Sequence, residues 1–144
     1  MPKGRDNQLT KQIGEHLVVS KLGRLGYLAT PFAGNVPFFD ILAINDQWQI
    51  IPIQVKTIKG PSWQFSINNF LDIEIKDNEQ IVNGKIKLDK ANLIYVLVKL
   101  KDDENDEFYI LQLKDLQEYF FNNYKSGIRP KNPTSMHCAV WSDE

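Results

Sequence analysis

The chain has 144 residues, of which 17 are basic and 18 are acidic, and its formal net charge is −1. This balance gives no overall attraction to nucleic acid or to a membrane surface, so any affinity for an anion must come from a local cluster of basic residues. Hydrophobic residues make up 42% of the chain and charged residues 24%, which excludes disordered, collagen-like and coiled-coil proteins and predicts a single domain over residues 1–144.

The single cysteine, Cys138, excludes an internal disulfide and a zinc site built from cysteines. No uninterrupted apolar run approaches the roughly 18 residues of a membrane span, and the polar start MPKGRDNQLTKQ lacks the pattern of a signal peptide. We therefore expect a soluble cytoplasmic protein.

A helix is predicted near the N-terminus, after a loose start over residues 1–6 that we treat as a terminal extension. Several residues between Asp6 and Thr10 could cap this helix, and its periodicity continues to about Leu25. Its apolar residues form two stripes, so we expect other parts of the protein to cover it on more than one side.

Extended segments and a second helix follow. Strands are predicted at residues 27–32, 39–44, 48–58, 63–67, 93–98 and 108–113. Residues 68–91 leave two alternatives open, either short strands at residues 71–75 and 81–88 or an insertion with a turn at Asn83-Gly84. Helical spacing returns at residues 114–125, and Gly127 is expected to end that helix.

The order of these elements predicts an α/β sandwich around a mixed sheet. Residues 128–144 are treated as a second terminal extension. The apolar content of residues 136–141 predicts that this extension docks on the body of the domain.

The most informative stretch is FFDILAINDQWQIIPIQVKT, residues 38–57, which is typical of two strands joined by a tight turn. Side chains of a strand alternate between its two faces, so Gln54 and Lys56 share one face of the second strand, and Asp40 lies on a matching face of the first. A carboxylate, an amide and an ammonium group are therefore predicted to meet at one end of an apolar hairpin.

The length of the turn sets which residues lie opposite one another. If the turn pairs Ile44 with Trp48, Asp40 lies opposite Pro52 and is the diagonal neighbour of Gln54, about 7–8 Å away. A proline inside a strand is disfavoured, so we also expect a bend or bulge near Pro52, and such irregularities often lie beside functional sites.

These residue types suit metal-dependent hydrolysis of a phosphodiester bond. Asp40 offers a hard oxygen ligand, and Gln54 could offer its amide oxygen. Lys56 could orient or deprotonate an attacking water, or stabilise charge on the phosphate. The alternative interpretation is a surface ion pair between Asp40 and Lys56, which would contribute about 0–1 kcal/mol.

Glu15 is a further candidate, because its neighbours one turn along the predicted helix, Val18, Val19 and Leu22, are apolar. Burying a carboxylate without a partner is costly, which favours a role in which Glu15 reaches the hairpin and joins a metal site. The alternative is a carboxylate that favours the helix N-terminus and extends to solvent.

Taken together, GEHLVVSKLGRLGY, FDILAI and IQVKT resemble the PD-(D/E)XK nuclease superfamily, in the QxK variant of Mrr-like restriction endonucleases and archaeal Holliday-junction resolvases. The resemblance covers roughly residues 10–67. Asp40 matches the metal-binding aspartate, Gln54 takes the position usually held by Glu or Asp, and Lys56 matches the catalytic lysine. Glu15 resembles the helix glutamate that some members add to the metal site.

The resemblance implies a fold and also shows departures. The implied fold is a restriction-endonuclease-like three-layer sandwich, in which a central mixed sheet of about four strands is flanked by helices in the order αβββαβ. Phe39 replaces the proline of the name motif, and Gln54 removes one negative charge, which should weaken binding of Mg²⁺. The helix that this order places between the third and fourth core strands is not evident in the sequence.

The implied activity is that of a Mg²⁺- or Mn²⁺-dependent endonuclease acting on DNA, in restriction, repair or recombination. The metal ligands implied are Asp40, Gln54, Glu15 and the backbone carbonyl of Val55. A homodimer or a recognition partner protein would supply specificity and the second strand cut. Two alternatives stay open: a nuclease-fold module that binds nucleic acid or a protein without effective catalysis, and a protein-interaction domain.

Overall fold

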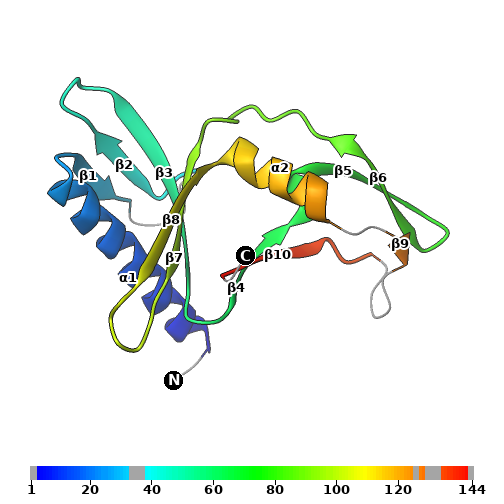
Figure 1. Ribbon diagram of the computed structural model, residues 1–144, viewed down its shortest axis with the longest axis horizontal. Helices are drawn as coiled ribbons and strands as arrows, with labels where there is room; N and C mark the ends of the chain where they lie inside the picture. The colour runs from blue at the N-terminus through cyan, green and yellow to red at the C-terminus, as the bar shows by residue number, and fades with distance from the viewer. Residues whose placement is uncertain (1–2, 33–37, 125–126, 129–133, 143–144) are drawn as a thin grey trace.

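The computed structural model describes residues 3–32, 38–124, 127–128 and 134–142. In chain order its elements are α1 (Lys3–Arg24), β1 (Leu28–Pro31), β2 (Ile41–Ile44), β3 (Ile50–Ile58), β4 (Ser62–Ser66), the 3₁₀ turn η1 (Ile67–Asn69), β5 (Leu71–Lys76), β6 (Glu79–Lys85), β7 (Ile94–Lys99), β8 (Glu107–Gln112), α2 (Leu113–Asn123), β9 (Gly127–Ile128) and β10 (His137–Trp141) (Figure 1). Neither described helix combines the length and the apolar character needed to cross a membrane.

A mixed sheet of five strands, in the order β1-β2-β3-β7-β8, forms the centre of the fold. Its pairs are antiparallel except for β3 and β7, which run parallel. Two smaller sheets accompany it, β10 with β4 and β5 with β6 and β9. The α/β class and the central mixed sheet predicted from the sequence are confirmed.

The two faces of the central sheet bury two different cores, and strand β7 contributes to both. Val96 and Val98 point to the face covered by α1 and belong to the same core as Val18 of the helix. Leu97 points to the opposite face, whose core is formed by aromatic and aliphatic residues of β4, η1, β5, α2 and β10. The strand predicted at residues 93–98 is therefore present as β7, and it is buried on both faces, as a continuous apolar run favours.

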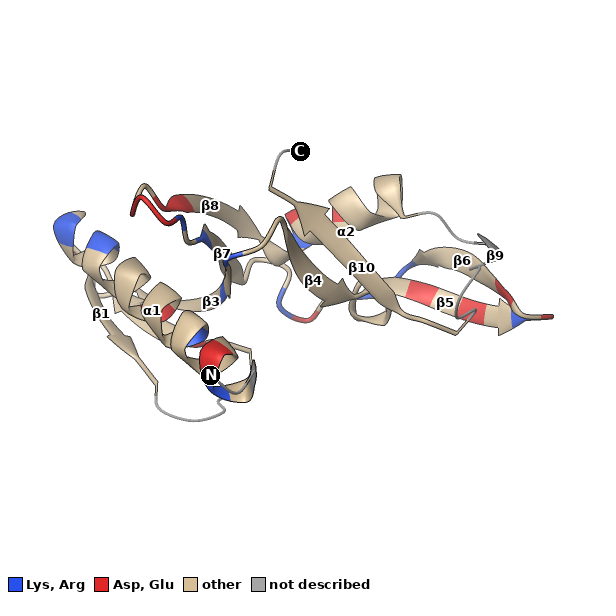
Figure 2. Cartoon of the chain, turned by 90° about the horizontal axis from the view of Figure 1, so that it is seen from below, with Lys and Arg blue, Asp and Glu red and all other residues tan. Residues whose placement is uncertain are grey.

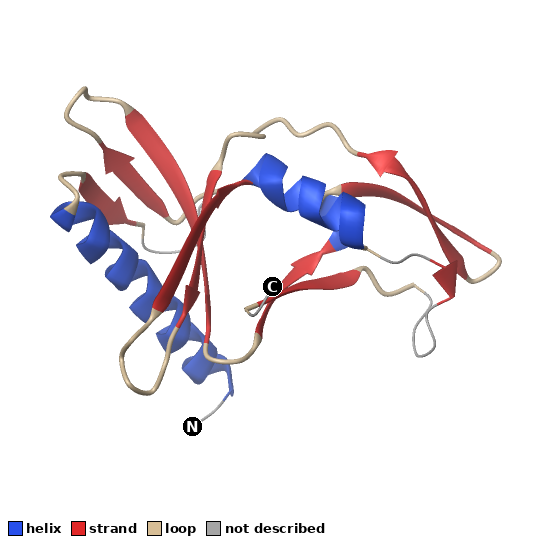
Figure 3. Ribbon diagram, in the orientation of Figure 1, coloured by secondary structure: helices blue, strands red, loops and turns tan. Residues whose placement is uncertain are grey.

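These cores define three layers, with α1 on one side of the central sheet and α2 on the other (Figure 3). The outer layer around α2 consists largely of strands. Helix α2 begins with a capping box between Gln112 and Asp115, which satisfies backbone groups at its start.

The connection between the parallel strands β3 and β7 differs from the expected topology. In the described structure it contains β4, η1, β5 and β6, and no α-helix. The helix that the superfamily order places between the third and fourth core strands is therefore wrong for this chain. A crossover between parallel strands needs a long connection that returns along the sheet, and here strands make it.

The N-terminal helix differs from its prediction in extent and in burial. It begins at Lys3, so the loose start expected over residues 1–6 is wrong for residues 3–6. Leu9 and Ile13 are 38% and 44% exposed, and Leu25, which follows the last helical residue, is 72% exposed, so the helix is not covered on several sides. In the described structure α1 packs on β1, β2 and β3, and these strands cover only one of its faces.

Residues 71–76 and 79–85 form the strands β5 and β6, so the alternative of short strands is confirmed, although β6 ends at Lys85 and does not extend to residue 88. The turn between β5 and β6 is at Asp77 and Asn78, with φ of 53° and 61°, and not at Asn83-Gly84. Asp and Asn adopt this left-handed conformation more readily than most residues, which suits a tight hairpin turn. Asn83 instead lies at an irregularity in the register of β6.

The C-terminal segment is part of the sheets. β10 pairs with β4 along its whole length, which confirms the predicted docking of residues 136–141. Gly127 does not end a helix, because α2 ends at Asn123 and Gly127 pairs with Gln80 of β6. Residues 129–133 and 143–144 of the predicted extension lie outside the described residues.

Candidate active site

The pairing of β2 with β3 places Asp40 beside Gln54. Ile44 pairs with Ile50 and Ile41 with Ile53, so the next position along, Asp40, is opposite Gln54. The predicted pairing of Ile44 with Trp48 is wrong by two residues. The correction brings the predicted site residues closer together than the sequence indicated.

A turn longer than expected causes this shift. The side-chain oxygen Oδ1 of Asn45 accepts hydrogen bonds from the backbone amides of Gln47 and Gln49, at 3.0 and 2.9 Å. Trp48 has a φ of 62°, in the left-handed region, and projects 81% exposed from the turn. Asn45, a short polar residue that bonds to backbone amides two and four residues later, thus lengthens the β2–β3 turn by two residues.

The carboxylate of Asp40, directly before β2, is held in a fixed position beside β3. Its Oδ2 accepts hydrogen bonds from Nε2 of Gln54 and from the backbone amide of Val55, both at 2.9 Å. The backbone amide of Asp40 donates to the carbonyl of Ile53 at 2.8 Å. The side chain is only 11% exposed, so its charge acts in a partly desolvated environment.

Helix α1 brings a second carboxylate to the same place. Nζ of Lys11 lies 3.9 Å from Oε1 of Glu15 and 3.9 Å from Oδ1 of Asp40, so one ammonium group bridges the two carboxylates. The Glu15 side chain is 12% exposed. The predicted approach of Glu15 to the hairpin is present in the structure, whereas Lys11 was missed, although it lies one helical turn before Glu15 and so on the same face.

The close approach of α1 to β3 depends on Gly14. A Cβ atom at this position would lie 1.7 Å from Oγ1 of Thr57, far inside van der Waals contact. The absence of a side chain at Gly14 therefore lets the helix pack directly on β3. This contact fixes where the neighbouring Glu15 lies relative to Asp40.

Burial raises the pKa of Glu15, and the negative charge of Asp40 raises it further, whereas Lys11 and His16 oppose the change. Two carboxylates in one desolvated place repel each other, so the site favours a cation or a proton. A carboxyl group whose pKa is raised by burial and by a neighbouring negative charge is typical of functional sites.

Replacing Glu15 with glutamine should therefore stabilise the protein at neutral pH. The pKa of Glu15 is higher in the folded than in the unfolded state. The contribution of its protonated form to stability is therefore complete at a pH below the unfolded-state pKa, and it is lost as the pH rises through the folded-state pKa. We expect Glu15→Gln to raise the melting temperature by roughly 1–3 °C at pH 7 and to leave it unchanged near pH 4. Glu104→Gln in the exposed β7–β8 turn is the control. Equal melting temperatures of Glu15→Gln and the wild type at pH 7 would contradict the assignment.

Lys56 lies on the same strand as Gln54, but it does not pair with Asp40. Its Nζ donates to the backbone carbonyl of Gln64 at 2.9 Å and lies 4.2 Å from the centre of the Phe65 ring. The ion pair that Asp40 makes within 4.0 Å among the described residues is with Lys11. The alternative of a surface ion pair between Asp40 and Lys56 is therefore wrong.

Burial lowers the pKa of Lys56, although the nearby Cys138 and Asp40 act in the opposite direction. A lysine with a lowered pKa loses its proton more readily than an exposed one, which is the property of a lysine that takes part in proton transfer.

Tyr95 is a neighbour of the site that sequence reasoning missed. It pairs with Gln54 in the parallel ladder between β3 and β7. Burial and the charge of Asp40 raise the pKa of its hydroxyl, which keeps it a proton donor. Its position inside the apolar run at residues 93–98 gave no signal of its own.

The oxygen donors at the site are of the type that Mg²⁺ prefers. They are the carboxylates of Asp40 and Glu15, the amide oxygen of Gln54, and the carbonyl of Val55, which points to the same strand edge as the amide that binds Asp40. Within the described residues no group of three or more His, Cys, Asp or Glu side chains could hold a metal. Two carboxylates would therefore need an amide, a carbonyl and water to complete a metal site.

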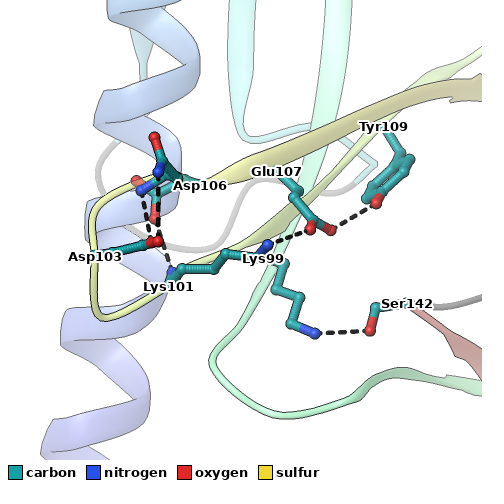
Figure 4. A network of polar contacts seen from close by, with 8 residues as sticks. Lys99, Lys101, Asp103, Asp106, Glu107, Tyr109 and Ser142 are labelled. Atoms are coloured by element: carbon teal, nitrogen blue, oxygen red, sulfur yellow. Dashed lines mark hydrogen bonds and ion pairs between the residues drawn. The ribbon is translucent and has the colours of Figure 1, made fainter.

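A second polar cluster lies at the β7–β8 turn (Figure 4). Lys101 contacts Glu107 at 2.6 Å, and the Tyr109 hydroxyl donates to the same carboxylate at 2.6 Å. Lys99 donates to Ser142 at 2.8 Å, which ties the turn to the C-terminal strand. These groups are partly exposed to solvent, so the contacts contribute little energy, and the turn that they hold ends where β8 begins at Glu107.

Comparisons with known proteins leave the family open. No family model matches the sequence, and no curated protein matches it. Among solved structures, the fold is similar to that of the bacterial homing endonuclease I-Ssp6803I, with a TM-score of 0.47 and 14% sequence identity over 84% of this chain and 75% of that chain. At this level of likeness, no residue role transfers to the present chain.

Proposed function

We propose that the chain is a metal-dependent endonuclease that hydrolyses phosphodiester bonds in DNA. The observation that carries this proposal is the convergence on Asp40: its carboxylate is fixed by Gln54 and Val55 and shares one ammonium group with Glu15. Lys56, with its lowered pKa, follows two residues after Gln54 on the same face of β3.

A Mg²⁺ or Mn²⁺ ion would be held by Asp40, Glu15, the amide oxygen of Gln54 and the carbonyl of Val55. Such an ion supplies charge stabilisation at the phosphate and lowers the pKa of a bound water. The position of Lys11, 3.9 Å from an oxygen of each carboxylate, supports the proposal, because two carboxylates that face one ammonium group also suit a metal cation.

The protein's own groups have separate roles in this proposal. Lys56 assists the attacking water, since its lowered pKa makes it a better proton acceptor than an exposed lysine. Tyr95 keeps its proton and can donate a hydrogen bond to a phosphate oxygen. The hydrogen bonds from Gln54 and Val55 keep Asp40 oriented during these steps.

Cleavage should depend on a divalent metal. We expect nicking of supercoiled plasmid and cutting of a labelled branched DNA in Mg²⁺ or Mn²⁺, complete loss of both in excess EDTA, and recovery when the metal is restored. The control is DNA incubated with metal alone. Cleavage that persists in EDTA would exclude the metal-dependent mechanism.

A nucleic-acid-binding module without catalysis is the second candidate. It is favoured by Gln54, which leaves two acidic ligands where the superfamily pattern has three. Calorimetric titration with Mn²⁺ separates the two candidates. Heat that disappears in Asp40→Ala supports the endonuclease, and the absence of heat in the wild type supports the binding module.

A further inference from the structure

A cavity of about 480 Å³ adjoins the candidate active site, and Gln54, Lys56 and Tyr95 line it. Its volume lies in the range of about 300–1,000 Å³ that is usual for small-molecule sites. Gln54 is also the residue that donates to Asp40 at 2.9 Å. An occupant of the cavity would therefore lie next to the phosphodiester bond being cut.

Phe38 lies at the border of this cavity in a strained conformation. Its φ is 76°, in the left-handed region that costs energy for an aromatic residue, and its side chain is 59% exposed. Nζ of Lys90 lies 4.2 Å from the centre of its ring. A strained, exposed aromatic ring two residues before Asp40 offers a flat surface for stacking.

The cavity combines aromatic, cationic and amide groups. Besides Phe38, the rings of Phe65 and Tyr95 line it, together with the side chains of Lys87, Lys90 and Asn69. Aromatic rings stack on bases, ammonium groups attract phosphates, and amides bond to base edges. Among the described residues of Figure 2, basic and acidic positions alternate over several elements. Three lysines, Lys56, Lys87 and Lys90, line the cavity together with one acidic residue, Asp89, so the cavity is a local source of attraction for a nucleic-acid strand.

The far wall of the cavity is held in place by a buried amide. Nε2 of Gln117 donates to the carbonyls of Phe70 and Ile86, both at 2.8 Å, and these two residues line the cavity. Gln117 is 8% exposed, and its bonds join α2 to the segments before β5 and after β6. The cavity is thus formed before any ligand enters.

We propose that this cavity takes the base of an unpaired nucleotide next to the scissile phosphate. The inference rests on the proposed nuclease function and adds its substrate class: DNA that is single-stranded or carries unpaired nucleotides at the cut. A base inside a duplex is stacked and paired, and it cannot enter a cavity of this kind without leaving the stack.

Binding measured in EDTA tests the inference separately from cleavage. The probes are labelled oligonucleotides of one sequence, either fully paired or with an unpaired 2-aminopurine nucleotide, and the proteins are wild type, Phe38→Ala and Trp48→Ala. Trp48 is a matched control, because it is also an exposed aromatic residue with positive φ, but it lies at the other end of the β2–β3 hairpin.

We expect the wild type to bind the unpaired probe at least about tenfold more tightly than the paired one, with a change in 2-aminopurine fluorescence. Phe38→Ala should lose most of this preference, since a stacking contact contributes about 5-fold or more to affinity. Trp48→Ala should keep it. Asn69→Ala, at an exposed position of the cavity wall, should weaken the preference without affecting the core.

The outcomes distinguish this inference from the proposed function. Preference for the unpaired probe without cleavage in Mg²⁺ or Mn²⁺ would support the cavity and refute the nuclease. Cleavage of paired DNA as fast as of unpaired DNA, with equal binding of both probes, would overturn the inference and leave the nuclease standing. Equal effects of Phe38→Ala and Trp48→Ala would also overturn it.

Discussion

Replacing Asp40 with asparagine is expected to lower the rate of DNA cleavage by at least about a hundredfold. The substitution removes the charge that both Glu15 and Lys11 face, while asparagine can still accept the hydrogen bond from Val55. A bound metal supplies several kcal/mol of charge stabilisation, and each 1.36 kcal/mol corresponds to about tenfold in rate. The measurement is plasmid nicking in Mn²⁺ under single-turnover conditions.

Asp46→Asn is the matched control, because Asp46 is an exposed carboxylate in the turn of the same hairpin. It should cleave at the wild-type rate. A second readout is independent of activity: in Asp40→Asn the pKa of Glu15, followed by NMR, should fall, since Asp40 contributes to raising it. An unchanged pKa of Glu15 together with an unchanged cleavage rate would show that Asp40 is not part of the active site.

The hairpin at residues 38–57 was predictable because its signals are local. Apolar alternation and turn residues indicate two strands, and the shared face of Gln54 and Lys56 follows from the period of a strand. The predicted register of β2 against β3 was wrong because it depended on Asn45, whose side chain accepts hydrogen bonds from two backbone amides and lengthens the turn. A sequence pattern indicates that a turn is present more readily than it sets the turn's length.

The parts of the site that the sequence did not reveal come from contacts between distant segments. Lys11 and Tyr95 meet Asp40 only because α1 and β7 both pack against β3. The cavity likewise combines Phe38 with the segment between β6 and β7. Neither Lys11 nor Tyr95 carries a motif, so only the fold brings them to the site.

The predicted helix in the connection between β3 and β7 is absent for a different reason. The superfamily resemblance stops near residue 67, and beyond it the expected helix came from the family order alone. The residues themselves, with β-branched alternation at residues 71–75 and a turn at Asp77, favour strands. Local pattern was therefore the better guide here than fold analogy.

Gly14→Ala is expected to destabilise the protein by about 2 kcal/mol, although alanine is the better helix former. The new Cβ would lie 1.7, 2.7 and 2.8 Å from three side-chain atoms of Thr57. Thr57 is β-branched and cannot rotate away from all three contacts, so α1 must move off β3. Overpacking costs about 1–3 kcal/mol, occasionally more, and contacts as short as 1.7 Å place this site at the upper end of that range. About 2 kcal/mol of destabilisation therefore remains after subtraction of the roughly 1 kcal/mol gained from helix propensity. The measurement is thermal unfolding, with an expected decrease in melting temperature of about 4–8 °C.

Gly23→Ala is the matched control, because Gly23 lies in the same helix and a Cβ atom at this position would have no neighbouring atom within 4 Å. The same substitution should therefore be neutral or stabilising at Gly23 and harmful at Gly14. Adding Thr57→Ala to Gly14→Ala removes two of the three clashing atoms and should restore part of the lost stability. Because displacement of α1 also moves Glu15 away from Asp40, Gly14→Ala should lose cleavage activity even at temperatures where it is fully folded. A Gly14→Ala protein as stable and as active as Gly23→Ala would show that the packing of α1 on β3 does not position the site.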